Sequence, residues 1–365
     1  GLGDWIANME LLPNGISGLA NRIEELGMKF GLWIEPEMVN KDSDLYRKHP
    51  DWILQTPGRR VSHGRYQYVL DFSRQEIVDY IYGMIAKLLS ESNISYIKWD
   101  MNRSITECYS IAYPADQQGE IFHRYILGVY NLYERLTSAF PEVLFESCAS
   151  GGGRFDPGML YYAPQGWVSD DSDAVERLKI QYGTSMCYPL SSMGSHVSVI
   201  PNHQVFRNTP LHTRANVAYF GTFGYELDLN KLSDAEIEEV KAQIRFMKEY
   251  RELLQFGTFY RLKSPFNGNE TVWMVVSEDK SKALVGYYRV LNGVNLPYSC
   301  VKLQGLDPDK LYENELANTK HYGDELMNLG LITTDVSAGE VPQGAEPCTD
   351  FESRIYLLKE KQSTN

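Results

Sequence analysis

The chain contains few of the residues that build metal centres, disulfide frameworks or membrane spans. Its 365 residues include five cysteines and seven histidines, and neither a Cys-x-x-Cys pair nor a His-x-His or His-Glu-x-x-His spacing occurs. We therefore expect no catalytic metal and no cofactor, and the odd number of scattered cysteines predicts a reducing compartment. No stretch of about 18 apolar residues is present, so no membrane-spanning helix is expected. The cysteines are Cys108, Cys148, Cys187, Cys300 and Cys348.

Positive charge is also scarce. The formal net charge is −13 at pH 7 and no run of basic residues occurs, so nucleic acid and anionic membrane surfaces are poor partners. With 43% hydrophobic residues the chain can bury a large core, and its length predicts more than one domain. The sequence also lacks internal repeats, proline-rich linkers and low-complexity segments.

A cation, a carboxylate and an amide follow a predicted strand in the run Lys98-Trp99-Asp100-Met101-Asn102-Arg103. The preceding residues, 94–97, are apolar and β-branched enough for a buried strand. Residues two apart on a strand share a face, so Lys98 and Asp100 are expected to project together, and the ammonium should keep a nucleophilic carboxylate ionised. A structural ion pair at the strand end is the alternative that this run alone leaves open.

Three carboxylates lie close together in a second run, Trp167 to Arg177. Asp173, followed by Glu176, is typical of a helix N-cap with its capping partner, whereas Asp170 and Asp171 have no such role. Hydrolysis of a glycoside requires two carboxyl groups, one that attacks or activates water and one that donates a proton to the leaving oxygen. An Asp in a crowded acidic turn binds its proton more tightly, which suits the donor.

Strand-like and helix-like segments alternate through about the first 260 residues, which predicts a parallel sheet and an (α/β) barrel. Chemistry in such a barrel lies at the carboxyl ends of the strands. The residues at these ends are Trp33, Asp100, Cys148 and Asp170. The predicted strands are 28–34, 68–71, 94–100, 143–148 and 167–170, with later barrel ends in 193–198 and 219–228.

Five helices are predicted along the same part of the chain. Asn14 is expected to cap the first, and two others are expected to begin with a capping box, Ser73 with Glu76 and Ser233 with Glu236. The predicted helices are 14–27, 73–89, 119–140, one from about 174, and 233–254.

Beyond about Arg261 the pattern changes to short alternating segments separated by turns. They predict a small antiparallel β-sandwich that supports the barrel, and hence a catalytic domain over 1–261 and a C-terminal domain over 262–365. The polar end, 359–365, is expected to fray. The predicted strands are 271–276, 283–290, 299–303, 326–331 and 353–358.

Four long motifs occur in order along the chain: Gly31-Leu32-Trp33-Ile34-Glu35-Pro36-Glu37-Met38, the run from Lys98, the stretch Phe145 to Asp156, and the run from Trp167. In this order and spacing they resemble the α-galactosidases of glycoside hydrolase family 36, and the likeness continues to about Leu329. The resemblance implies a (β/α)8 TIM-type barrel followed by a small antiparallel β-sandwich. It also implies a retaining α-galactosidase that hydrolyses melibiose- and raffinose-type oligosaccharides.

The resemblance assigns Asp100 as the nucleophile and Asp170 as the acid/base of a double displacement. A planar aromatic can cover the apolar face of a sugar, cations and amides reach its hydroxyls, and a glycine lets backbone N–H groups approach closely. Taken singly, Trp33 and Cys148 are as typical of a buried core, and Arg65 of a solvated loop. The implied substrate-binding residues are Trp33 as an apolar platform, Arg65 and Lys98 as donors to ring hydroxyls, Asn102 beside the nucleophile, and Cys148 with Gly151 near the 2-hydroxyl.

The chain departs from the family pattern at its start. Members carry an N-terminal β-rich domain and a first barrel strand ending in Asp-Asp-Gly-Trp, whose acids hold the galactose 4- and 6-hydroxyls, before the segment that matches Leu2 to Trp5. We therefore expect a barrel that lacks its first strand and exposes the edges of its neighbours. Asp4 is not assigned the role of those acids. Asp171 stands where Asn is common, and a second acid there should raise the pKa of Asp170.

The resemblance further implies a cytoplasmic, often tetrameric enzyme. Three alternatives stay open: a galactosyltransferase that shares every catalytic residue, an α-N-acetylgalactosaminidase, and a sugar-binding module without activity. Cys148 argues against the second, because that enzyme needs room at the 2-position. Product analysis with an acceptor, paired substrate assays and calorimetry with galactose would distinguish them.

Overall fold

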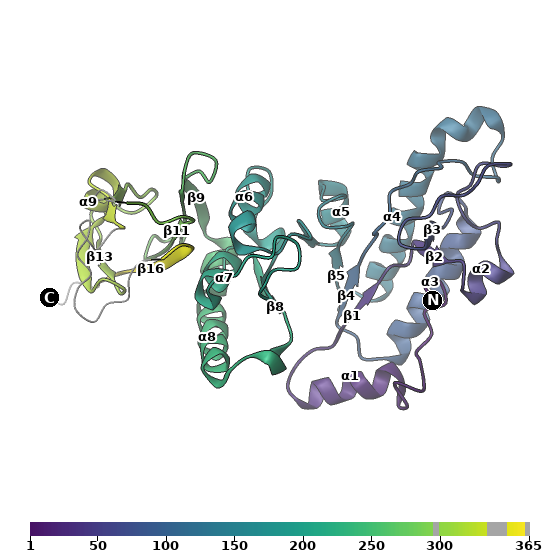
Figure 1. Cartoon of the computed structure of the whole chain (residues 1–365), viewed down its shortest axis with the longest axis horizontal. Coiled ribbons are helices and arrows are strands. Elements are labelled where there is room, and N and C mark those ends of the chain that lie inside the picture. Colours follow the sequence, from purple (N-terminus) through teal and green to yellow (C-terminus); the bar gives the residue numbers. More distant parts are fainter. Residues whose placement is uncertain (295–298, 334–348, 362–365) are drawn as a thin grey trace. The chain divides into compact units, whose positions relative to one another are not determined.

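The structure is a computed structural model that describes residues 1–294, 299–333 and 349–361. The chain forms two units, Gly1–Asp170 and Asp171–Asn365 (Figure 1). Cys348 and most of the predicted frayed end lie outside the described residues. Within the described ranges, no helix is long and apolar enough to cross a membrane.

Parallel strands form the centre of the first unit. They pair in the order β1 (Gly31–Ile34), β4 (Tyr96–Trp99), β5 (Leu144–Ser147) and β6 (Gln165–Trp167). Helices α1, α3 and α4 alternate with them along the chain, and α3 and α4 run beside the strands in Figure 1. This alternation confirms the predicted parallel barrel architecture. The helices are α1 (Gly15–Glu25), α2 (Asp44–Lys48), α3 (Gln75–Glu91), η1 (Ala115–Glu120), α4 (Ile121–Ala139) and α5 (Pro157–Tyr162).

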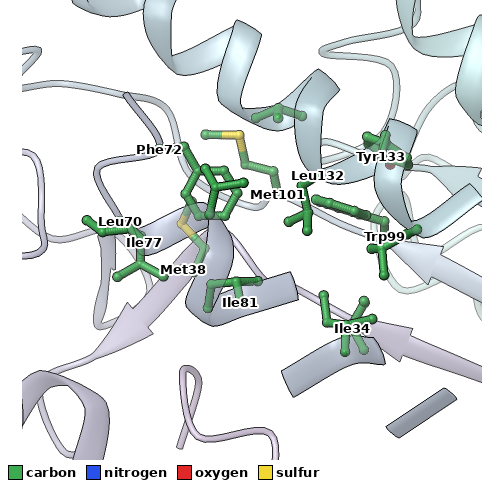
Figure 2. Packing of buried hydrophobic residues seen from close by; sticks show 14 of the residues in the cluster. Ile34, Met38, Leu70, Phe72, Ile77, Ile81, Trp99, Met101, Leu132 and Tyr133 are labelled. Atoms are coloured by element: carbon green, nitrogen blue, oxygen red, sulfur yellow. The ribbon is translucent and has the colours of Figure 1, made fainter. Parts of the chain in front are cut away.

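The core of this unit holds the chain on both sides of Asp100 (Figure 2). Trp99 at the end of β4 stacks on Tyr133 of α4, with ring centroids 4.0 Å apart. Met101 is buried in the same core, together with Ile81 of α3. Burial of a methionine or isoleucine side chain stabilises a fold by about 1.5–3 kcal/mol. The backbone that carries Asp100 is therefore fixed by packing.

A hairpin lies outside the main sheet and replaces one predicted barrel strand. β3 (Gln67–Val69) pairs antiparallel with β2 (Met38–Asn40), so the prediction that 68–71 belongs to the barrel is wrong. The carboxylate of Asp4 caps the nearby α2, accepting from the backbone N–H groups of Asp44 and Leu45, each at 2.9 Å. Asp4 therefore has a structural role at the start of α2.

The predicted capping box at the start of α3 is also wrong. Arg74 occupies the N-cap position and has no side-chain cap hydrogen bond. The hydroxyl of Ser73 donates to Asp71, and the carboxylate of Glu76 accepts from Arg74. Side-chain competition for the same donors and acceptors thus overrides the local Ser-x-x-Glu pattern.

A buried ion pair connects the loop after β1 to the loop after β5. Glu37 is 0% exposed and accepts two hydrogen bonds of 2.9 Å from the guanidinium of Arg154. Trp99 Nε1 and the hydroxyl of Tyr125 donate to the same carboxylate at 2.8 and 2.5 Å. This buried charge is thus well supplied with donors, which is the condition under which such a pair is tolerated.

We expect Arg154→Met to lower the free energy of unfolding by about 3–5 kcal/mol, because it leaves Glu37 charged, buried and without its cation. Urea unfolding followed by tryptophan fluorescence measures this loss. Replacing the exposed Arg47, whose partners Asp42 and Asp44 are also exposed, should change little. Equal effects of the two substitutions would contradict the argument.

The second unit continues the alternation with β7 (Met193–Ser198) and β8 (Thr222–Glu226), which pair in parallel. Both strands lie within ranges predicted as barrel ends. Helix α8 (Asp234–Phe256) begins with the predicted capping box of Ser233 and Glu236. The other helical elements are α6 (Ala174–Thr184), η2 (Leu190–Ser192), α7 (Leu211–Ala218) and η3 (Leu229–Lys231).

An antiparallel sheet follows, in the order β14-β13-β16-β11-β10-β9. One of its faces shares a core with the small sheet of β12 and β15 and with α9, which gives the predicted sandwich. The strand predicted over 326–331 is wrong, because α9 occupies its first half and a strand begins only at Leu331. Strands β9, β13 and β14 were not predicted. The elements are β9 (Thr258–Lys263), β10 (Glu270–Val276), β11 (Lys282–Arg289), β12 (Cys300–Val301), β13 (Leu311–Asn314), β14 (Thr319–Tyr322), α9 (Gly323–Asn328), β15 (Leu331–Ile332) and β16 (Glu352–Glu360).

Candidate active site

Asp100 lies directly after β4 and is surrounded by hydrogen-bond donors. Its Oδ2 accepts from Trp33 Nε1 at 3.0 Å and from Asn102 Nδ2 at 2.7 Å, and its Oδ1 accepts from the backbone N–H of Met101 at 2.8 Å. The thiol of Cys148 donates to the same carboxylate. The donors come from β1, from the loop after β4 and from the end of β5, so neighbouring strands deliver them together.

This environment keeps Asp100 ionised although it is only 7% exposed. Burial alone would raise its pKa, but the hydrogen bonds from Trp33, Cys148, Asn102 and the Met101 backbone outweigh burial and hold the pKa below the ordinary value. The carboxylate therefore stays available as a nucleophile in mildly acidic solution.

Lys98 has a different partner from the one predicted. Its ammonium forms an ion pair with the buried Glu146 at 3.3 Å and lies 4.5 Å from the ring centre of Trp167. Tyr96 also donates to Glu146. The expectation that Lys98 keeps Asp100 ionised therefore needs correction, because hydrogen bonds are the leading cause of the lowered pKa.

Cys148 and Lys98 nevertheless share one neighbourhood. Cys148 is buried, and its backbone N–H donates to the carbonyl of Trp99 at 2.8 Å. Burial raises the pKa of the thiol well above its ordinary range, the charge of Asp100 raises it further, and the charge of Lys98 opposes this. The thiol is therefore protonated and serves as a donor rather than as a thiolate nucleophile.

Gly151 brings the loop after β5 against the backbone that carries Asp170. Its φ is +85°, and a Cβ there would lie 2.7 Å from Ser169 Cα and 2.8 Å from the backbone nitrogen of Asp170. The adjacent Ser150 donates to Asn102 Oδ1 at 3.3 Å. Contacts thus lead from Asp100 through Asn102 to the segment of Asp170, which follows β6 and is exposed.

We expect Gly151→Ala to lower kcat/KM by about 100-fold while the protein remains folded. Backbone atoms of 169–170 would have to shift to admit the methyl group, and a misplacement of about 1 Å in a catalytic group can cost that much. Gly83 in α3 has open space around its Cβ position, so Gly83→Ala is the matched control. Unchanged kinetics of Gly151→Ala would show that this contact does not position Asp170.

Arg65 lies in the turn before β3 and is exposed, with a left-handed φ of +53°. Burial raises the pKa of Glu35, which follows β1 directly, and the charge of Arg65 opposes this rise. Trp33 is 41% exposed despite its hydrogen bond to Asp100. An indole that is partly exposed while it donates to Asp100, and an exposed guanidinium that acts on the neighbouring Glu35, suit the predicted contacts with a sugar.

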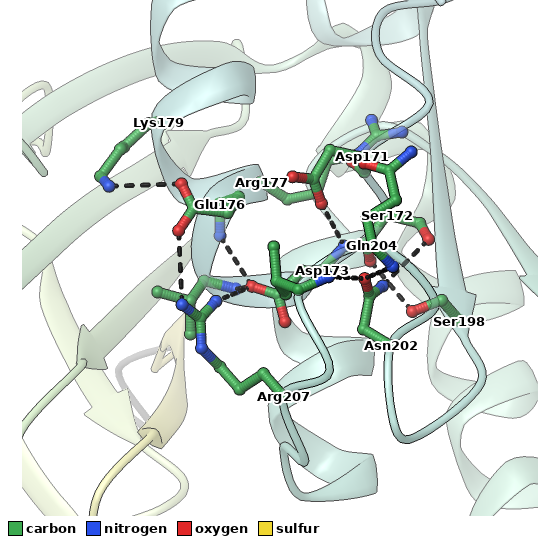
Figure 3. Close-up of polar contacts among 12 residues, drawn as sticks. Asp171, Ser172, Asp173, Glu176, Arg177, Lys179, Ser198, Asn202, Gln204 and Arg207 are labelled. Carbon is green, nitrogen blue, oxygen red and sulfur yellow. Dashed lines mark hydrogen bonds and ion pairs between the residues drawn. The ribbon is translucent and has the colours of Figure 1, made fainter.

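The acidic run after Asp170 is held by a polar network in the second unit (Figure 3). Asp173 caps α6 as predicted, accepting from the N–H groups of Val175 and Glu176, each at 3.1 Å. Arg207 pairs with both acids, Asp173 and Glu176. Glu176 thus directs its carboxylate to a cation, which differs from the reciprocal capping bond that its spacing predicted.

Asp171 has a structural contact that the sequence did not indicate. Its Oδ1 accepts from the backbone N–H of Asp173 at 3.0 Å. The buried Arg177 donates to the carbonyl oxygens of Asp171 and Gly194 at 2.7 and 2.9 Å, and Ser198 donates to that of Ser172. The backbone that follows Asp170 is therefore fixed at successive residues.

Two buried carboxylates were missed as parts of this region: Glu35, which is 0% exposed, and Glu37 with its partner Arg154. The only signal in the sequence was their place in the Glu-Pro-Glu motif beside Trp33.

In the described ranges, no group of three or more His, Cys, Asp or Glu side chains is arranged to hold a metal ion.

Comparison with known families agrees with this architecture. Residues 1–257 match the melibiase family, and residues 270–358 match the C-terminal domain of glycosyl hydrolase family 36. The chain therefore belongs to glycoside hydrolase family 36, and the resemblance carried by the four motifs is confirmed.

Individual relatives are α-galactosidases. AgaA of Geobacillus stearothermophilus is 57% identical over 361 residues, which cover 99% of this chain and 48% of AgaA. Mel36A of Lactobacillus acidophilus is 50% identical, covering 98% and 47%. The crystal structures of AgaA and of the Lactobacillus brevis α-galactosidase match with TM-scores of 0.94 and 0.95 at 53% and 49% identity. They cover 99% and 100% of this chain and 49% of each structure. The chain thus spans about half the length of these relatives.

Proposed function

We propose that this protein hydrolyses terminal α-galactosides of raffinose-type oligosaccharides with retention of anomeric configuration. The observation that carries the proposal is the environment of Asp100, a buried carboxylate held ionised by donors from neighbouring strand ends. Family membership supplies the substrate class. AgaA variants in complex with raffinose and with stachyose have been solved as crystal structures, which supports substrates of this kind.

In the first step, an oxygen of Asp100 attacks the anomeric carbon and forms a β-linked galactosyl ester. The bond from that carbon to the leaving oxygen breaks, and the oxygen takes a proton from Asp170. In the second step, Asp170 accepts a proton from water, whose oxygen attacks the same carbon and releases Asp100. Because each displacement inverts the carbon, the product keeps the α configuration.

The spacing of the two acids supports the assignment of Asp170. The AgaA variants crystallised with raffinose and with stachyose each carry one aspartate substitution, and these two aspartates are seventy positions apart. Asp100 and Asp170 have the same separation. Inactivating either member of a catalytic pair is a common way to trap a substrate, so the coincidence favours this pair.

The remaining predicted residues have the chemistry that a galactose site requires. Trp33 would cover the apolar face of the ring, Arg65 and Lys98 would donate to hydroxyls, and Cys148 with Gly151 would lie near the 2-hydroxyl. The domain boundary at residue 261, the cytoplasmic location and the tetramer stay predictions.

Proton NMR of the first galactose formed from raffinose tests the proposal. We expect the α-anomer to appear first and to mutarotate later. Initial release of the β-anomer would contradict retention, and no release of galactose from raffinose, melibiose or an aryl α-galactoside would contradict the proposed activity. Carboxyl groups of retaining enzymes lie about 5–5.5 Å apart, which a structure with bound galactose can measure.

A further inference from the structure

We infer that Glu35 is a positioning residue of the proposed active site, whose charge holds both the nucleophile's neighbour Asn102 and the turn that carries Arg65. The inference deepens the proposed function and rests on it. Neither the motif match nor the roles assigned above give Glu35 a task, yet it is fully buried directly after the strand that supplies Trp33. A buried carboxylate is costly unless its hydrogen bonds are satisfied.

Both oxygens of Glu35 are used. Oε1 accepts from the backbone N–H of Asn102 at 2.6 Å, and Oε2 accepts from Gln67 Nε2 at 2.9 Å. The two donors come from segments that are far apart in the sequence, one after β4 and the other at the start of β3. One carboxylate therefore joins the loop after β4 to the start of β3.

The first of these contacts leads to the nucleophile. Asn102, whose backbone is held by Glu35, uses its side-chain amide to donate to Asp100 at 2.7 Å and to accept from Ser150 at 3.3 Å. Fixing the backbone of Asn102 fixes the direction of this amide. Glu35 thus acts on the orientation of Asp100 through one intermediate residue.

The second contact leads to the cation proposed to bind the sugar. Gln67 is 4% exposed, and its backbone N–H closes the turn by donating to Gly64 at 2.9 Å. Within that turn Arg65 and Tyr66 both have left-handed φ values, +53° and +61°. Such conformations cost energy and persist only where surrounding contacts enforce them. The hydrogen bond from Gln67 to Glu35 is one such contact.

Two charged groups act on Glu35 from neighbouring elements: Asp100 at the end of β4 and Arg65 in the turn before β3. Burial has the largest effect on the pKa of Glu35 and raises it, and the charge of Asp100 raises it further. The hydrogen bond from Asn102 and the charge of Arg65 lower the pKa. The net result is a pKa above the ordinary value of a glutamate. Protonation of Glu35 on acidification therefore removes its attraction for Arg65 before Asp100, with its lowered pKa, is protonated.

Glu35→Gln removes the charge and can keep the shape. Gln67 Oε1 is buried without a hydrogen-bond partner. If the Gln67 amide rotates, this oxygen can accept from the side-chain NH₂ of the glutamine at position 35. The side-chain oxygen of that glutamine can still accept from the backbone N–H of Asn102. We expect KM for an aryl α-galactoside to rise about tenfold while kcat changes much less, because Arg65, the cation proposed to bind the sugar, loses the negative charge of Glu35. The acid limb of kcat/KM should also move to lower pH. Glu35, the group that is protonated first in the wild-type protein, is no longer present, so protonation of Asp100 at lower pH becomes limiting.

Glu35→Ala should in addition lower kcat by about 100-fold, because Asn102 and Gln67 lose their acceptor and the nucleophile is no longer oriented. Glu37→Gln is the matched control: it alters an equally buried carboxylate of the same motif that binds Arg154 instead. It should lower stability and leave the pH profile unchanged.

Wild-type KM and an unshifted acid limb in Glu35→Gln would overturn the inference, as would a shift of the same size in Glu37→Gln. Calorimetry with galactose separates this outcome from failure of the proposed function. If the wild-type protein bound galactose without hydrolysing galactosides, the proposed function would fail. Weaker binding by Glu35→Gln than by wild type would still support the positioning role, and equal binding would refute it.

Discussion

Asp100→Ala is expected to lower kcat on raffinose by on the order of 10⁴-fold or more, because it removes the group that we propose forms the covalent intermediate. The donors around it, Trp33, Asn102 and Cys148, remain in place. They leave a small cavity lined by N–H and S–H groups, which suits an anion. Added azide should enter this cavity, attack from the side of the missing carboxylate and yield β-galactosyl azide from an aryl α-galactoside.

Asp71→Ala is the matched control for this experiment. Asp71 is also a buried carboxylate of the first unit, and it accepts hydrogen bonds from Ser73 and Ser110. Its loss should reduce stability, keep kcat close to the wild-type value and show no response to azide. Residual activity of Asp100→Ala near the wild-type level, or an α-galactosyl azide as product, would refute the assignment of Asp100 as nucleophile.

Much of the barrel architecture could be predicted because it is written in local patterns. The apolar run before Asp100, the helical periodicity over 121–139 and the Ser-x-x-Glu pattern at Ser233 each depend on residues a few positions apart. Strand ends carry the chemistry in such folds, so Trp33 and Cys148 could be placed beside Asp100 before any coordinates were known.

The errors arise where a side chain has a partner that local spacing does not indicate. Ser73 fits a capping box, but its hydroxyl donates to Asp71, and Lys98 pairs with Glu146 instead of Asp100. The pair of Glu37 and Arg154 spans 117 positions. No window of local sequence contains both partners of the two ion pairs, so propensity and spacing could not reveal these contacts.

The acidic run shows both situations within a few residues. Asp173 could be identified as an N-cap because its carboxylate accepts from N–H groups two and three positions further along the chain. The roles of Arg177 and Arg207 could not, because their partners lie at Gly194 and Asp173 in other segments. Tertiary contacts, rather than the run itself, decide how the chain after Asp170 is held.

Asp170→Ala should have an effect that depends on the leaving group. Hydrolysis of raffinose, whose departing oxygen needs a proton, is expected to fall by about 10²–10⁴-fold. Formation of the galactosyl-enzyme from a dinitrophenyl α-galactoside should be spared, because that leaving group departs without protonation. Release of the ester should then limit turnover, so a burst of dinitrophenol is expected. Azide should accelerate the release and yield α-galactosyl azide, the anomer opposite to that from Asp100→Ala.

Asp171→Asn tests the neighbouring acid and serves as the matched control. It keeps an acceptor for the backbone N–H of Asp173, which now donates to Asp171 Oδ1 at 3.0 Å, so activity on both substrates should persist. The proposed general acid, Asp170, must be protonated to act, and a nearby negative charge generally raises the pKa of a carboxyl group. Removing that charge should therefore move the alkaline limb of kcat/KM to lower pH. Equal losses on raffinose and on the dinitrophenyl substrate in Asp170→Ala would show that Asp170 does not protonate the leaving group.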